Sequence, residues 1–199
     1  ALSEIAVALG KEKIKEELQA RAIKYRENLN KLWDEEKGIY LNKRLDTNEF
    51  SSKISPTNFY PLLANAPSQK QAERMVKEHL YNPNEFWGEY ILPSIAFNDP
   101  DYKSNDYWRG RIWAPMNFLV YKGLKNYNLE KVRKDLVAKS KSLLLKQWSN
   151  NGYVCENYNS RTGECDDVNR CDLFYHWGGL LGFMSLVEDG YLSGVNKKD

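Results

Sequence analysis

Apolar residues recur at helical spacing along most of the chain. Near the start, Leu2, Ile5 and Leu9 lie on one helical face, and the pattern stops at Gly10. Further apolar stripes follow, each opposed by a polar face. Ser55-Pro56 is typical of a helix start, with serine as the N-cap and proline at the first helical position. The predicted helices span residues 2–9, 11–33, a short segment from 56, 69–80, 112–127, 129–148 and 176–189.

Strand signals are almost absent, apart from a short candidate at 38–42. Two long connections, 81–105 and 149–173, have no periodicity, and loops of this length are usually functional or disordered. The many aromatic residues in the first connection favour order. The pattern therefore predicts an all-α chain, with residues 1–199 forming one segment built from helical hairpins.

The composition narrows the classes of partner. Of the 199 residues, 42% are hydrophobic and 28% are charged, which is typical of a globular chain. A net charge of +2, spread evenly, gives no strong attraction to nucleic acid or to a membrane surface. No apolar run approaches the ~20 residues of a membrane span. The six Trp and thirteen Tyr suit a carbohydrate-binding protein, but they also suit a large helical core.

The three cysteines, Cys155, Cys165 and Cys171, lie at spacings of ten and six. This pattern matches neither a zinc site nor a disulfide framework. We expect free thiols in a reducing compartment such as the cytoplasm. A single disulfide within the loop from Cys155 to Cys171 is the alternative.

The stretch 105–111 concentrates side chains that suit sugar recognition. Trp108 and Trp113 flank Arg109, and Asp106 lies just upstream. Aromatic faces stack on the C–H face of a sugar ring, while guanidinium and carboxylate groups bond its hydroxyls. The alternative is a loop that fills the core, with its arginine paired to structural carboxylates.

A second set of candidate residues lies in the connection 149–173 and just beyond it. Glu156 stands among aromatic and amide residues rather than among charges, although it could also be a carboxylate that caps a loop. His176 suits either a pocket or a helix N-cap, and Asp166 and Asp167 read as turn formers. With His79 at a polar helix end, no histidine-based metal site is predicted.

Several segments, in this order along the chain, resemble glycoside hydrolase family 63, whose members are trehalase-like (α/α)6-toroid glycosidases. The landmarks are Leu32–Glu36, Gly38–Tyr40, Ser55-Pro56, Glu85–Tyr90, Tyr107-Trp108-Arg109-Gly110 with Ile112-Trp113, Glu156–Asn159 with Thr162-Gly163, and His176-Trp177-Gly178. The resemblance spans nearly the whole chain.

The resemblance implies an inverting hydrolase of α-linked glucosides or related oligosaccharides, with two carboxyl groups and neither metal nor cofactor in the chemistry. The general base maps to Glu156. The sugar-binding residues map to Trp108, Arg109, Trp113, His176 and Trp177, and by extension to Trp87 and Glu89.

The resemblance is incomplete in one respect. The family's general acid is an aspartate in an earlier motif, for which this chain has no counterpart, and the predicted helices amount to about half of a toroid. We therefore expect the carboxy-terminal half of a catalytic domain that pairs with itself or with an amino-terminal half. The chain begins at Ala1, already in helical rhythm, which fits a piece of a longer protein.

Two other functions remain open from the sequence. One is a non-catalytic carbohydrate-binding or scaffold protein that keeps the pocket without the acid. The other is a toroid enzyme of another kind, such as a sugar epimerase or lyase. The latter generally relies on histidine pairs, whereas this chain has one histidine suited to a pocket.

Overall fold

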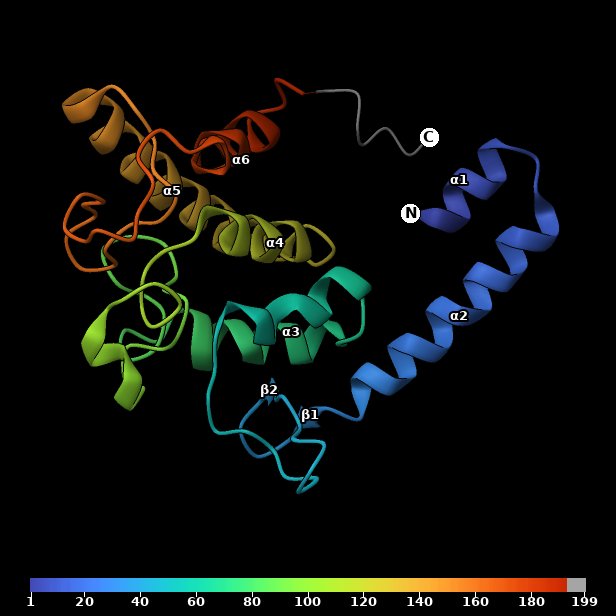
Figure 1. The fold of residues 1–199 in the computed structure, drawn as a ribbon. Coiled ribbons are helices and arrows are strands. Elements are labelled where there is room, and N and C mark those ends of the chain that lie inside the picture. Colours follow the sequence, from blue (N-terminus) through green and yellow to red (C-terminus); the bar gives the residue numbers. More distant parts are fainter. Residues whose placement is uncertain (193–199) are drawn as a thin grey trace.

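The computed structural model describes residues 1–192 and is largely helical, as the sequence predicts (Figure 1). The first two helices, α1 (Leu2–Ala8) and α2 (Glu12–Asn30), pack on each other and extend to one side of the other helices. The apolar stripe predicted on α2 is largely exposed. Only the carboxy-terminal end of that segment, at Leu29 and Leu32, packs against the core.

A small antiparallel hairpin follows α2. Its strands are β1 (Trp33–Asp34) and β2 (Ile39–Tyr40), with Trp33 opposite Tyr40. The candidate strand at 38–42 is thus present, although it is only two residues long. Tyr40 is buried against the helices beyond, and the side chain of Asn58 donates a hydrogen bond to its carbonyl oxygen (2.7 Å).

The helix predicted from residue 56 is a 3-10 helix, η1 (Pro56–Ala64), and Ser55 caps it as expected. Pro61 lies inside this helix, where its missing N–H disfavours regular α-helical hydrogen bonding. Ser68 caps α3 (Gln69–Met75), and the predicted helix continues to residue 80 as a π-helical turn, η2 (Val76–Leu80). The first long connection is ordered and contains another 3-10 segment, η3 (Pro100–Ser104).

The main body stacks η1 and α3, then α4 (Ala114–Leu124), then α5 (Glu130–Asn151) with α6 (Leu180–Glu188) (Figure 1). α4 is the central helix and packs against η1, α5 and α6. It approaches η1 so closely that a Cβ atom at Gly123 would lie 2.7 Å from the Cβ atom of Leu62. The final predicted helix begins with a 3-10 turn, η4 (His176–Gly179), which continues into α6.

The helix predicted over 112–127 begins two residues late, at Ala114. Ile112 instead forms β-bridges with Pro93 on one side and Tyr158 on the other. The two long connections are thereby held beside the amino-terminal end of α4. None of the helices within residues 1–192 combines the length and the apolar character that a transmembrane span requires.

Candidate functional site

Backbone hydrogen bonds bring the two candidate segments together. The N–H of Ile112 donates to the carbonyl oxygen of Tyr158 (2.7 Å), and the N–H of Tyr158 donates back to that of Ile112 (3.0 Å). Ile112 follows the tryptophan-rich stretch, and Tyr158 lies two residues after Glu156. Segments about 45 residues apart in the chain therefore lie side by side.

Three tryptophans form one aromatic cluster. The rings of Trp108 and Trp113 are stacked, with centroids 3.8 Å apart and planes 15° apart. Trp113 is buried (1% exposed), whereas Trp108 is 49% exposed. The ring of Trp177, in η4, meets Trp113 edge-on at 5.9 Å. The exposed indole thus rests on a fixed aromatic base.

The turn that presents Trp108 has unusual backbone geometry. Tyr107 has φ = +49°, a left-handed conformation that is strained for a bulky residue. Residues with such strain cluster at functional sites. Gly110 has φ = +118°, and a Cβ atom there would lie 2.7 Å from the ring of Tyr102. The Nε1 atom of Trp113 donates to the carbonyl oxygen of Tyr107 (3.0 Å), which holds the turn against the cluster.

Glu156 lies next to this cluster and is half-buried. The Nε1 atom of Trp177 donates to its backbone oxygen (2.8 Å), and the side-chain amide of Asn157 donates to Oε2 (3.3 Å). The pKa of Tyr107 is raised, mainly by the negative charge of the Glu156 carboxylate, then by desolvation of the phenol and by a hydrogen bond between the two side chains. The carboxylate, one phenol and three indoles therefore share one site.

Sequence reasoning missed Arg111, which is fully buried (0% exposed). Its Nη2 and Nη1 atoms donate to the two carboxylate oxygens of Asp167 (2.9 and 3.2 Å), and its Nε atom donates to Oδ1 of Asn157. Asn159 also donates to Asp167 (2.6 Å). The only signal in the sequence was an arginine directly before the apolar residues Ile112 and Trp113, since a charged side chain among buried neighbours needs a partner.

Asp167 lies in a bend, as its interpretation as a turn former predicts, but its side chain also holds a buried arginine. Burial alone would raise the pKa of Asp167, but the hydrogen bonds from Arg111 and Asn159 hold it below its ordinary value. Arg109, which the sequence favoured, is exposed and pairs with Asp106 (2.9 Å). That geometry leaves the Arg109 guanidinium at the surface.

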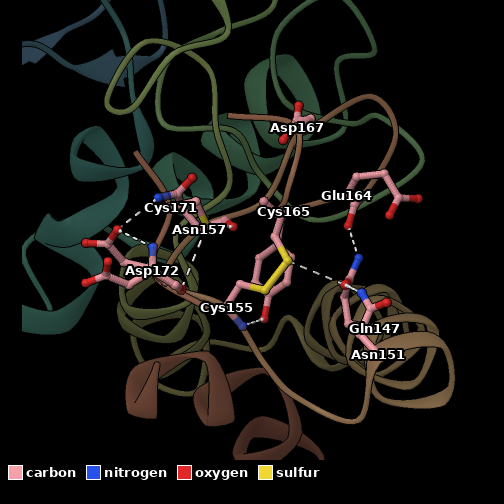
Figure 2. Close-up of a disulfide and its surroundings, with 12 residues drawn as sticks. Gln147, Asn151, Cys155, Asn157, Glu164, Cys165, Asp167, Cys171 and Asp172 are labelled. Carbon is pink, nitrogen blue, oxygen red and sulfur yellow. Dashed lines mark hydrogen bonds between the residues drawn. A yellow bond between two sulfur atoms is a disulfide. The ribbon is translucent and has the colours of Figure 1, made fainter. Parts of the chain in front are cut away.

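The expectation of free thiols is wrong for two cysteines, since Cys155 and Cys165 form a disulfide (Figure 2). The loop brings their Cα atoms to 6.2 Å, which is within bonding range. Cys171 is free; its thiol donates to the carbonyl oxygen of Asn157 (3.1 Å), and burial raises its pKa. Gln147, on α5, contacts the disulfide at Cys165, so the loop is tied to a helix (Figure 2).

The remaining predicted residues lie at varying distances from this centre. His176 is exposed, and its ring contacts Tyr175 (4.9 Å) and Trp177 (5.9 Å). Trp87 instead packs on Tyr81 (4.6 Å) and beneath the ammonium group of Lys139 on α5 (4.8 Å). The same ammonium group binds the carbonyl oxygen of Glu89, whose side chain is exposed. These contacts place Trp87 and Glu89 against α5 rather than in the aromatic cluster.

His79 lies near the end of η2 and is buried. Its Nδ1 atom lies 2.7 Å from Glu85 and its Nε2 atom lies 2.6 Å from the carbonyl oxygen of Lys37. Burial alone would lower the pKa of His79, but these two hydrogen bonds, with the nearby charges of Glu85 and Glu78, raise it above its ordinary value. Within residues 1–192, no group of three or more His, Cys, Asp or Glu side chains is arranged to hold a metal ion.

Comparison with known proteins finds relatives that are glycoside hydrolases. Mannosylglycerate hydrolase of Thermus thermophilus is 32% identical over 119 residues, which cover 58% of this chain and 28% of that protein. The cytosolic neutral trehalase of Kluyveromyces lactis is 34% identical over 185 residues, covering 90% of this chain and 23% of the trehalase. The chain thus spans less than a third of the length of these curated relatives.

Solved structures of similar fold also include a glycoside hydrolase. A family 63 mannosylglycerate hydrolase of Thermus thermophilus, crystallised with glucose, superposes with a TM-score of 0.76 at 25% identity. The match covers 92% of this chain and 43% of that structure, so the fold is that of the (α/α)6-toroid glycosidases, of which this chain forms a part. The family profile matches residues 1–178. The chain therefore belongs to the mannosylglycerate hydrolase MGH1-like glycoside hydrolase domain family, as the resemblance to family 63 predicts.

Proposed function

We propose that this chain supplies the general base and part of the sugar pocket of an inverting glycosidase that cleaves α-linked glucosides or mannosides. The observation that carries the proposal is the convergence of the tryptophan stack and Glu156, joined through Trp177 and Tyr107. An aromatic face next to a carboxylate is suited to hold a sugar ring with its anomeric carbon near a base.

The surroundings of Glu156 support the role of base. An inverting enzyme keeps its two carboxyl groups ~6.5–9.5 Å apart, so that a water molecule fits between base and sugar. Glu156 is half-buried and receives a hydrogen bond from Asn157, a contact that orients the carboxylate. The general acid would come from outside these 199 residues, so we expect the chain alone to bind sugar without hydrolysing it.

The test is Glu156→Gln in the whole protein, with turnover of mannosylglycerate, trehalose and simple α-glucosides measured. Removing the base should lower kcat by a factor of ~10²–10⁴ and leave sugar binding largely intact. The matched control is Glu164→Gln, which changes a surface carboxylate of the same loop that pairs with Lys146 (2.7 Å). Wild-type turnover in Glu156→Gln would contradict the assignment.

The stereochemistry gives a separate check on the mechanism. With an inverting mechanism, the sugar first released from an α-linked substrate has the β configuration, which NMR detects before mutarotation. First release of the α anomer would contradict the inverting mechanism. Sugar binding by the whole protein without any turnover would instead support a non-catalytic carbohydrate-binding protein.

A further inference from the structure

Arg111 carries a charge that is fully buried, and the proposed role of Glu156 does not itself require it. A buried guanidinium is costly unless it is paired and hydrogen-bonded. Here Asp167 accepts two of its hydrogen bonds and so balances the charge. The Nε–H group is directed elsewhere, to Oδ1 of Asn157.

That hydrogen bond fixes which way the Asn157 amide faces. A guanidinium has donors only, so the end of the amide that meets Arg111 must be the oxygen. Nδ2 is then directed to the other side, where Oε2 of Glu156 lies at 3.3 Å and the carbonyl oxygen of Arg170 at 3.5 Å. Asn157 is itself fully buried, so water cannot replace either partner at low cost.

We propose that Arg111 is a positioning residue for Glu156, acting through the side-chain amide of Asn157. Without Arg111, the amide could rotate and present its oxygen to the carboxylate, which would repel Glu156 from its position. Asp167 holds the guanidinium in turn, and Asn159 helps to fix Asp167 by donating to the same carboxylate. The positioning of Glu156 by Arg111 does not depend on the proposed function. Only the statement that the positioned carboxylate is a general base rests on it.

The test uses NMR of the 15N-labelled chain and needs no turnover. In the wild type, acidification should shift the side-chain amide signals of Asn157 in a step that depends on the Glu156 carboxylate, because Nδ2 donates to it. Glu156→Gln should abolish that step. Arg111→Lys keeps the charge but loses the planar fork, so it should remove most of the step and speed amide exchange with water roughly tenfold, as expected for one lost hydrogen bond.

Arg133→Lys is the matched control. Arg133 also holds a carboxylate through two contacts, from Nε to the oxygens of Glu188 (2.8 and 3.0 Å), but it does so between α5 and α6. This control should lower stability without changing the Asn157 signals. If Arg111→Lys leaves the step and the exchange rate as in the wild type, the proposal is wrong.

Measurements on the wild-type chain and on Glu156→Gln test the proposal even if Arg111→Lys does not fold. An Asn157 amide that shows no step, or a step that persists in Glu156→Gln, overturns the proposal. A step that depends on Glu156, together with a nuclear Overhauser contact between the Nε proton of Arg111 and the Asn157 side chain, supports it. Turnover by Glu156→Gln in the whole protein tests the proposed function separately, so either can fail alone.

Discussion

Trp108 and Trp113 have the same side chain and stack on each other, yet they have different roles in the structure. Trp113 is buried and hydrogen-bonded through Nε1, so it belongs to the core. Trp108 keeps half of its surface exposed, with its position fixed by the ring beneath it. A preorganised aromatic face binds a ligand at a smaller entropic cost than a mobile one.

We therefore expect Trp108→Ala to weaken the binding of glucose or mannose by the chain. The lost stacking should cost about 1–2 kcal/mol, which is roughly five- to thirtyfold in the dissociation constant. Trp148→Ala is the control, because Trp148 is similarly exposed but lies at the end of α5. Ligand-observed NMR titration measures both. If the two variants bound the sugar with equal affinity, Trp108 would not be part of the sugar pocket.

Among the elements, the β1–β2 hairpin is held to the helical body through His79. The turn after β1 supplies the carbonyl oxygen of Lys37, and the loop after η2 supplies Glu85. A carbonyl oxygen and a carboxylate both accept, so both contacts are hydrogen bonds when both ring nitrogens carry protons, that is, when the imidazole is charged. The His79 ring thereby links η2, the turn after β1 and the loop after η2 through two contacts that depend on its protonation.

These contacts predict a dependence of stability on pH. Because folding raises the pKa of His79, its contribution is fully present below the ordinary histidine pKa of about 6.5 and is lost as pH rises through the folded value. The free energy of unfolding should therefore fall as pH rises from about 6 to about 8, by an amount that His79→Gln removes. Urea unfolding of both proteins at the two pH values measures it. His176→Gln, at the exposed second histidine, should retain the decrease.

The sequence predicted the elements more fully than the site. Helix positions followed from apolar spacing and from the Ser55 cap, since both are local signals. The role of Arg111 did not, because its partners Asn157 and Asp167 lie far along the chain and are brought near it where Ile112 pairs with Tyr158. The pairing of Cys155 with Cys165 depended in the same way on the path of the loop.

At the scale of the whole molecule, the helices α1 and α2 leave many apolar side chains exposed. α2 buries none of its residues, and Ile14, Ile23 and Tyr25 are exposed along it. The amino-terminal helix and the residue after it add further apolar side chains, namely Leu2, Ile5, Val7 and Leu9. Exposed apolar side chains gathered on two helices that pack on each other are typical of an interface.

We expect the isolated chain to associate through this surface. Sedimentation equilibrium should give a mass above 23.2 kDa that rises with concentration, and Ile14→Glu with Ile23→Glu should lower it toward the monomer. Leu45→Glu is the control, because Leu45 is also exposed but lies in the loop after β2, outside α1 and α2. A monomer at every concentration, with no binding of a hydrophobic dye, would contradict the expectation.

The bond between Cys155 and Cys165 has a consequence for the integrity of the site. Glu156 and Asn157 lie inside the closed ring, whereas Asp167 lies just after it. A protease that cut once among the residues between the two sulfur atoms would leave both new ends attached to one molecule. Asp167, which follows the ring, would stay covalently linked to Arg111, which precedes it, until a reductant opened the disulfide.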